Sequence, residues 1–441
     1  MNFDRMRALL LDQAIRGELD EGNPTDSVVP VVEGCLKKES YPFEVPDSWR
    51  WYPLGKILEY GKATQVSSDQ ISETTWVLDL EDIEKGTGRL VTKKRGTPTT
   101  SNKAKFSKGD VLYGKLRPYL NKVVIADEAG VCTTEIVPIN VKNAKVALSS
   151  EYLKSYLMSP YFLDYANKIS YGVKMPRLGT KDAKAALIPV PPIEEQVRIV
   201  AKLDEAITEI DRAEKAYREL QTLSGVLRGQ ILQEAIQGKL VPQLEEEGTV
   251  KSLVEGPFEL PKSWGWQKFE AVLLFENGDR GANYPAKSTL TQDPISGHPF
   301  VSAINLKNGH IDKDGLLYLS TEQQKKLRSG HIKSGDCLFC IRGSLGKFGF
   351  AKTDGGAIAS SLVILRRKDP TTLREKFLSY LLQSPFFDQC IKDRSNGTAQ
   401  PNLGAKELKG FFFPLPPVQE QDRIVAKVEE LLKQVDALSG E

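Results

Sequence analysis

An internal repeat constrains the fold of this chain more than any other feature of its sequence. The sequence of residues 188–202 returns in similar form at residues 413–427, so that Pro189 matches Pro414 at an offset of 225 residues. Shorter matches follow in nearly the same register: 109–113 with 335–339, 159–162 with 384–387 and 172–178 with 397–403. Near the start of each unit, 46–51 also pairs with 261–266. This period is far longer than that of a solenoid, so the repeating unit is a whole domain plus its connector.

One match is out of order along the chain. Residues 11–19 resemble residues 232–240, which follow the first connector. The corresponding segment is missing after the second connector and stands at the N-terminus instead. The two units therefore look like a closed ring opened at one point, which predicts a pseudo-two-fold axis. We expect the N-terminal helix to dock beside the C-terminal one, with the two termini close together.

Each connector carries a stripe of apolar residues at the three-and-four spacing of a helix. This spacing places the side chains on one face and is typical of a coiled coil, although packing against a globular core is the usual alternative. Two equivalent stripes in one chain favour mutual pairing, and two-fold symmetry predicts that it is antiparallel. The first stripe resumes at Leu220, Leu223 and Leu227. The predicted interface residues are Ile193, Val200, Leu203, Ile207, Ile210, Tyr217, Val418, Val425, Val428, Leu432 and Val435.

The segments between the connectors have the mixed pattern of an α+β fold. Residues 110–113 and 361–365 predict strands, whereas 152–158 and 377–382 predict helices that end at a Ser-Pro pair. We expect two globular mixed α/β domains separated by long antiparallel coiled-coil helices. The predicted parts are an N-terminal helix (1–20), a first domain (21–192), a central helix (193–240), a second domain (241–417) and a C-terminal helix (418–441).

Composition and missing motifs limit the function classes. The net charge is only +2, so a surface for nucleic acid must be local. Long apolar stretches are absent and five cysteines are scattered along the chain, which favours a cytoplasmic protein. Cys337 and Cys340 lie on a predicted strand with their thiols on opposite faces, so we expect no metal site. The sequence has no P-loop and no recognisable catalytic set, so we expect no catalytic residues.

The repeated motifs resemble those of a known family. The Pro-Pro-Ile/Val, Glu-Gln and Arg-Ile-Val-Ala-Lys boundary, the Gly-Asp-x-Leu strand and the helix end at 231–240 are similar to the specificity subunit of Type I restriction-modification systems. The resemblance covers essentially the whole chain. It implies two target-recognition domains, each of which reads one half of a split, asymmetric DNA sequence. It also implies that the conserved helices form the spacer and dock the methyltransferase subunits.

The resemblance also implies the partners and cofactors of the chain. Two methyltransferase subunits would methylate adenine with S-adenosylmethionine, and two restriction-translocase subunits would use ATP and Mg²⁺. This chain would bind double-stranded DNA and no cofactor of its own. Residues 76–83 resemble a common form of the recognition domain, whereas residues 300–306 depart from it, which implies a different half-site.

Cations and polar loop residues mark the expected DNA surface, because phosphate needs positive charge and base edges need hydrogen-bonding groups. A solvated surface is the alternative for any single lysine. The candidates in the first domain are Lys93, Lys94, Arg95, Lys103, Lys105, Lys115 and Arg117. The candidates in the second domain are Asn283, Tyr284, Arg342, Ser344 and Lys347.

Two matched loops are the better candidates for reading bases. The first loop carries Tyr171, Lys174 and Arg177, and its counterpart carries Asn396, Gln400 and Asn402. Lysine and arginine suit guanine O6 and N7, whereas asparagine and glutamine suit adenine N6 and N7. A frame that repeats while its loops diverge is expected of two modules that read different sequences.

Two alternatives from other classes stay open at the level of sequence. One is a self-contained DNA methyltransferase or nuclease with fused recognition domains, which would turn over a methyl donor without partners. The other is a coiled-coil scaffold that does not bind DNA, which would show no sequence preference over competitor DNA.

Overall fold

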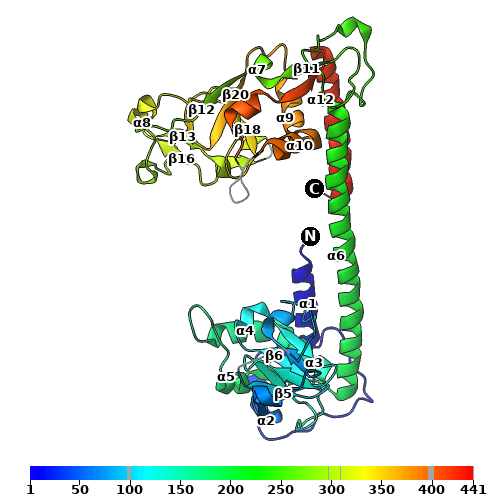
Figure 1. Ribbon diagram of the computed structural model, residues 1–441. Helices are drawn as coiled ribbons and strands as arrows, with labels where there is room; N and C mark the ends of the chain where they lie inside the picture. Colours follow the sequence, from blue (N-terminus) through cyan, green and yellow to red (C-terminus); the bar gives the residue numbers. More distant parts are fainter. Residues whose placement is uncertain (97–100, 296, 308, 396–401, 441) are drawn as a thin grey trace. The chain divides into compact units, whose positions relative to one another are not determined.

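The computed structural model describes residues 1–96, 101–295, 297–307, 309–395 and 402–440. The chain divides into two compact units, Met1–Tyr217 and Arg218–Glu441 (Figure 1). The boundary falls within the long helix α6 (Ile193–Ile236), so each unit contains part of that helix. None of the helices in the described ranges is long and apolar enough to cross a membrane.

Unit 1 combines three sheets with a small group of helices. Strand β1 pairs with β10, the order of the second sheet is β2-β5-β8-β3-β4, and that of the third is β7-β6-β9. The helices are α1 (Phe3–Arg16), α2 (Leu54–Ile57), α3 (Ser150–Met158), α4 (Pro160–Ile169) and α5 (Thr180–Ala185), with short 3-10 turns η3 (Leu80–Asp82) and η4 (Pro118–Leu120). The strands are β1 (Arg50–Pro53), β2 (Gln65–Val66), β3 (Trp76–Leu78), β4 (Lys94–Arg95), β5 (Lys103–Phe106), β6 (Val111–Gly114), β7 (Val123–Ile125), β8 (Gly130–Cys132), β9 (Ile136–Ile139) and β10 (Leu187–Val190).

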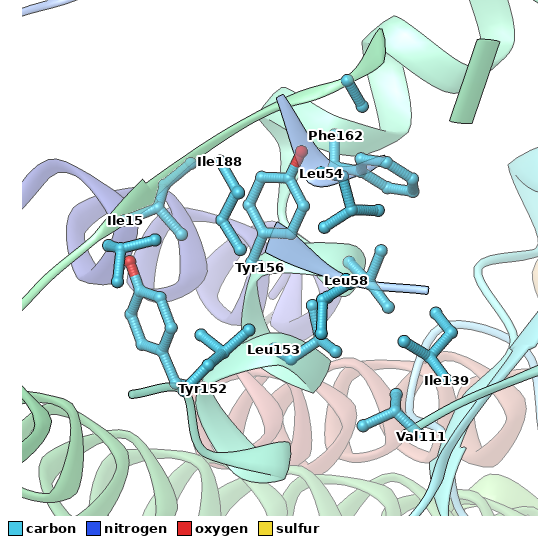
Figure 2. Close-up of a cluster of buried hydrophobic side chains, with 14 of the residues drawn as sticks. Ile15, Leu54, Leu58, Val111, Ile139, Tyr152, Leu153, Tyr156, Phe162 and Ile188 are labelled. Atoms are coloured by element: carbon cyan, nitrogen blue, oxygen red, sulfur yellow. The ribbon is translucent and has the colours of Figure 1, made fainter. Parts of the chain in front are cut away.

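The β7-β6-β9 sheet of unit 1 lies between two apolar cores, because alternate residues of a strand point to opposite faces. Val111 and Ile139 face the larger core, where they pack with Tyr152, Leu153 and other side chains of the helices (Figure 2). Leu112 faces the smaller core, which it shares with the five-stranded sheet. The predicted strand at 110–113 and the predicted helix at 152–158 are confirmed as β6 and α3.

Unit 2 repeats this plan with its own elements. Its helices are α7 (Phe269–Val272), α8 (Thr321–Lys326), α9 (Glu375–Gln383), α10 (Pro385–Arg394), α11 (Ala405–Lys409) and α12 (Val418–Ser439), with the 3-10 turn η7 (Ala303–Asn305). Its strands are β11 (Gly265–Lys268), β12 (Leu273–Asn277), β13 (His298–Val301), β14 (Leu306–Lys307), β15 (His310–Ile311), β16 (Leu317–Leu319), β17 (Cys337–Cys340), β18 (Phe348–Phe350), β19 (Ala357–Ile358), β20 (Leu362–Arg367) and β21 (Phe412–Leu415). The sheets have the orders β11-β21, β12-β20-β17-β18, β16-β13-β19 and β14-β15.

Strand β17 of unit 2 separates two cores in the same way as β6 of unit 1. Cys337 and Phe339 pack into the helical core, whereas Leu338 and Cys340 pack into the core on the other face. The two thiols of the Cys-x-x-Cys pair therefore lie on opposite faces, as the strand register predicts. In the described part of the chain, no group of three or more histidine, cysteine or acidic side chains could hold a metal ion.

Helix α1 packs antiparallel to the first part of α6 within unit 1. The rings of Phe3 and Tyr217 lie 5.9 Å apart, and Arg7 Nη2 lies 2.6 Å from Asp211 Oδ1. Beyond the end of α1, Lys202 Nζ lies 2.8 Å from Asp20 Oδ1. The contacts move backward along α6 as the chain advances along α1, which defines an antiparallel pair.

Helix α12 makes the matching pair with the second part of α6 within unit 2. Arg228 forms an ion pair with Asp436, at the repeat positions of Arg7 and Asp211. Farther along, Gln243 Nε2 donates to Glu420 Oε1 at 3.1 Å. Each unit thus contains one antiparallel helix pair. Docking of the N-terminal helix beside the C-terminal one, which the permuted repeat predicts, would join the two units and stays a prediction.

The apolar stripes on the connectors pack within their own units. Leu203 belongs to the buried core of unit 1, and Val428 and Val435 belong to that of unit 2. The side chains at Leu220, Leu223 and Leu227, where the first stripe resumes, are exposed. The described contacts of the stripes are therefore those of core packing and of the two helix pairs. Pairing of the two stripes with each other, which would join the units, stays a prediction.

A buried glutamine at the start of α6, and its match in α12, fixes each helix to its domain. Gln196 Nε2 donates to the carbonyls of Ala147 and Pro191, both at 2.9 Å, and Gln196 Oε1 accepts from Ser149 N at 2.8 Å. Gln421 makes the same three bonds, to Thr372 O, Pro416 O and Arg374 N, at 2.9, 3.0 and 2.8 Å. The connector helices therefore leave both domains through the same hydrogen-bonded joint.

A glycine ends the other helix of each pair against a proline and a tryptophan. Gly17 and Gly238 have φ angles of +76° and +70°, in the left-handed region that favours glycine. An added Cβ would lie 2.6 Å from Pro46 Cγ at the first position and 2.4 Å from Pro261 Cγ at the second. The close packing leaves no room for a side chain at either turn.

We predict that Gly238→Ala destabilises unit 2. The variant combines a left-handed alanine with a clash against Pro261, and we expect the free energy of unfolding to fall by about 2 kcal/mol or more. The matched control is Gly225→Ala within α6, where nothing lies within 4 Å of the added Cβ. The control should be neutral or stabilising by up to about 1 kcal/mol. Urea denaturation of both variants tests this, and equal effects would contradict the assigned turn.

Candidate nucleic-acid interface

The end of one central strand meets two loops in each unit, and the hydrogen bonds that join them are duplicated. In unit 1, Lys115 N donates to Glu135 O at 2.9 Å and Leu178 N donates to Lys115 O at 3.0 Å. In unit 2, Ile341 N donates to Ser361 O and Leu403 N donates to Ile341 O, both at 3.0 Å. The same three segments therefore converge in both domains, and we call this place the strand-end site.

The loop at 171–177 projects from the strand-end site of unit 1. Tyr171 and Arg177 close the loop through two backbone bonds, of 3.1 and 2.9 Å, so the residues between them form a hairpin-like tip. The side chain of Tyr171 is 60% exposed, and Lys174 and Met175 are also exposed. Within the described residues, Lys174 has no ion-pair partner. This tip therefore presents an aromatic ring and a cation, and base reading by the loop stays a prediction.

Arg177 at the base of this loop is held by an acid. Its Nε and Nη2 atoms donate to the Glu135 carboxylate at 3.0 to 3.1 Å, and this pairing raises the pKa of Arg177. The pair fixes the direction of the guanidinium group. Arg177 therefore supports the loop as well as adding charge.

The turn after β6 stores backbone strain next to this loop. Arg117 and Asn121 have φ angles of 52° and 47°, which are unusual for residues other than glycine. They flank η4, which carries the exposed side chain of Tyr119, and Arg117 N donates to Pro176 O at 2.7 Å. Strain of this kind gathers at functional sites. The half-buried Lys115 precedes this turn.

The basic run on β4 is neutralised by neighbouring carboxylates. Lys93 Nζ lies 2.9 Å from Asp127 Oδ1, and hydrogen bonds to Asp127 and then Glu128 raise its pKa. Lys94 pairs at 2.8 Å with the buried Asp82, and Arg95 pairs at 2.7 Å with Glu128. A phosphate would have to compete with these acids. Contact of the run with DNA stays a prediction.

The two lysines of β5 differ in exposure. Lys103 is buried and its Nζ lies 2.7 Å from Asp79 Oδ1, so it is already committed to an ion pair. Lys105 is exposed and has no ion-pair partner among the residues that the structure describes. Of the two, Lys105 is the one that is free to meet a phosphate.

The segments 76–83 and 300–306 share a backbone in spite of their different sequences. In both units a strand leads into a 3-10 turn with a capping box, formed by Asp79 and Asp82 in unit 1 and by Ser302 and Asn305 in unit 2. The charged cap of unit 1 holds Lys103, whereas the cap of unit 2 is neutral. The capping side chains therefore differ in charge at matched positions, while the backbone structure stays the same.

The candidates of unit 2 gather around the loop after β17. Arg342, Ser344 and Lys347 are exposed on this loop, and Arg342 forms an isolated β-bridge with the exposed Asn402. Asn283 is half-buried, and the ring of Tyr284 lies 5.8 Å from that of Phe300. Asn396 and Gln400 lie outside the described residues.

Sequence analysis missed Arg280, which belongs to the same surface. Its side chain is exposed, and Nη2 lies 3.4 Å from the carbonyl of Ser360, next to Ser361 of the strand-end site. The signal in the sequence is the turn Gly278-Asp279-Arg280-Gly281, which directly follows β12 in the structure. The repeat comparison overlooked it because unit 1 has no similar residues in register.

Comparison with known proteins identifies the family of this duplicated structure. The family model described as the Type I restriction modification DNA specificity domain matches twice, at residues 46–221 and 265–440. The chain belongs to the Type I DNA specificity family. It is a DNA specificity subunit of a Type I restriction-modification system, with two target-recognition domains within an α+β fold.

Relatives of this specificity subunit match along most of its length. The Type I restriction enzyme EcoAI specificity subunit of Escherichia coli is 24% identical, over 98% of this chain and 90% of the relative. The MjaVIII specificity subunit of Methanocaldococcus jannaschii is also 24% identical, over 91% of this chain and 89% of the relative. The two resemblances confirm the family that the repeated motifs predict.

Solved structures share the fold of the specificity subunit. A chain from a structural study of complex assembly and conformational transition in the type I R-M system has a TM-score of 0.71 and 23% identity, covering 90% of this chain and 93% of that chain. The HsdS subunit from Thermoanaerobacter tengcongensis has a TM-score of 0.54 and 24% identity, covering 90% of this chain and 92% of that chain. At these identities the likeness concerns the fold alone.

We predict that Lys174→Gln changes the half-site read by the first domain of the specificity subunit. A lysine at an exposed tip suits guanine, whereas glutamine suits adenine, so preference for one base should change by about tenfold or more. Methylation-sensitive long-read sequencing of DNA from cells that carry the variant and its methyltransferase partner measures the target. The half read by the second domain serves as the internal control. A change confined to that second half would contradict the assignment of the loop.

Proposed function

We propose that this specificity subunit reads a two-part, asymmetric DNA target, with one recognition domain for each half. The observation that carries the proposal is a shared frame with unlike chemistry at the strand-end site. The same backbone bonds join Lys115 to Glu135 and Ile341 to Ser361, but an acid stands in one domain and a serine in the other. Two recognition domains that share a backbone arrangement but carry different side chains suit two different half-sites.

We also propose that the chain is not an enzyme and that its partners supply the catalysis. Two methyltransferase subunits would use S-adenosylmethionine to methylate adenine, and two restriction-translocase subunits would use ATP and Mg²⁺, in the cytoplasm. The presence of one antiparallel helix pair in each unit supports this stoichiometry, because two similar surfaces suit two copies of one partner. The ion pairs Arg7–Asp211 and Arg228–Asp436 mark the matched positions on these surfaces.

A methyl-transfer assay tests the division of labour. The purified chain alone should transfer no methyl group from S-adenosylmethionine to DNA, whereas the chain with its methyltransferase partner should methylate only DNA that carries the target. A partner without this chain should methylate no defined sequence. Methyl transfer by the chain alone would overturn the proposal in favour of a self-contained methyltransferase.

We predict that α6 sets the number of unread base pairs between the two halves of the target. The exposed segment 218–223 of α6 is a suitable site for a four-residue helical insertion, whereas Leu203 and Asp211 anchor the preceding segment to unit 1. Four residues add about 6 Å along the helix and make about one turn, so the insertion adds little net rotation. The gap should widen by one or two base pairs, at about 3.4 Å each.

The same sequencing assay reads this outcome. Both half-sites should keep their bases, since neither recognition domain changes. A substitution of four alanines for residues 219–222, which keeps the length of α6, is the matched control and should leave the gap unchanged. New bases in a half-site with an unaltered gap would contradict the spacer role of α6.

A further inference from the structure

Two arginines of unit 2 lie beyond the ends of the two strands that flank β20 in its sheet. Strands β12 and β17 both pair antiparallel with β20, so they run in the same direction. Their last residues, Asn277 and Cys340, pair with Val363 and Leu362 at the start of β20. The chain therefore leaves both strands at one edge of the sheet. Arg280 and Arg342 follow within three residues of these ends.

Contacts to one short turn bring the loops that carry the two arginines together. Arg280 Nη2 lies 3.4 Å from the carbonyl of Ser360, and the backbone of Ile341, next to Arg342, donates to Ser361 O at 3.0 Å. Burial and the nearby positive charge of Arg342 lower the pKa of Arg280. The positive charge of Arg342 therefore lies close enough to act on Arg280.

This pair of cations lacks a carboxylate partner among the described residues, although an acid stands beside it in the chain. Asp279 is buried, and its two carboxylate oxygens accept from Gly281 N and Arg328 N, both at 2.9 Å. Those bonds hold the loop that carries Arg280 in a fixed shape. At the matching position in unit 1, Glu135 neutralises Arg177, whereas unit 2 has Ser361.

Two neighbouring like charges repel each other, and an anion between them removes that repulsion. The edge of a base carries no net charge, so it compensates the repulsion less than a phosphate does. We propose that Arg280 and Arg342 together bind a single backbone phosphate of the DNA and so fix the register of the second recognition domain. This inference rests on the proposed function, because it assumes that the second domain meets DNA.

Salt-dependent binding of the complete complex with its methyltransferase partner tests the proposal. The probes are a duplex that carries the target found by sequencing and a duplex of equal length without it. Each of Arg280→Ala and Arg342→Ala should weaken binding to both duplexes by about tenfold. The slope of log affinity against log salt should become shallower by about 0.9, which corresponds to one phosphate. The double variant should show the slope of a single variant, because both arginines serve one phosphate.

Lys352→Ala is the matched control for loss of one positive charge. Lys352 is exposed near the start of β17, since Cys337 pairs with Phe350, and so lies at the opposite end of that strand from Arg342. It should leave affinity and slope unchanged. Arg280→Lys and Arg342→Lys keep the positive charge and should keep most of the salt slope. They therefore distinguish loss of charge from loss of folding in the alanine variants.

Three outcomes would overturn the shared phosphate site. They are unchanged affinity and slope in both alanine variants, additive slope changes in the double variant, and a change in the bases read by the second domain. The last outcome would assign the arginines to base recognition. Failure of the proposed function is distinguishable, because the wild-type complex would then bind both duplexes equally well.

Discussion

The hydrogen-bonded joint around Gln196 and Gln421 is the interaction on which the rest of the structure depends. Each buried amide satisfies two carbonyls and one N–H at the point where a domain gives way to a helix. Loss of either side chain would leave buried backbone groups without partners, which is costly in a dry interior. The joint fixes the direction in which each helix leaves its domain. The position of each strand-end site relative to its own helix follows from that direction.

The duplicated helix pairs fix the direction of each connector helix over a whole unit, in addition to the single glutamine joint. Arg7 and Arg228 both reach an aspartate on the antiparallel partner, and Gly17 and Gly238 both turn the chain against a proline and a tryptophan. The permuted order of the segments lets α6 serve both pairs, so one continuous helix belongs to two units. A change of length in α6 therefore acts between the units and leaves the two frames intact.

Sequence alone predicted much of this frame because the repeat aligns residues that perform the same task. Strands β6 and β17, the helices that end at the Ser-Pro pairs and the order of the segments all follow from matched motifs. The packing partners of the apolar stripes could not be predicted in the same way. A helix shows the same three-and-four spacing whether it packs against another helix or against a globular core. Leu203 is buried and Leu223 is exposed, although both continue one pattern. Charge pairing was also hidden, because Asp127 is distant in sequence from Lys93.

The exchange of Glu135 for Ser361 shows how one frame can serve two kinds of contact. In unit 1 the acid locks Arg177 by two hydrogen bonds, so the guanidinium loses little further freedom and supports a rigid loop tip. In unit 2 a serine stands at that position, and Arg280 and Arg342 have no carboxylate partner among the described residues. We infer that the same corner of unit 2 suits an anion. The backbone bonds around the two positions are alike. Recognition can therefore diverge by substitution of side chains at the strand-end site, without any change in the fold that positions it.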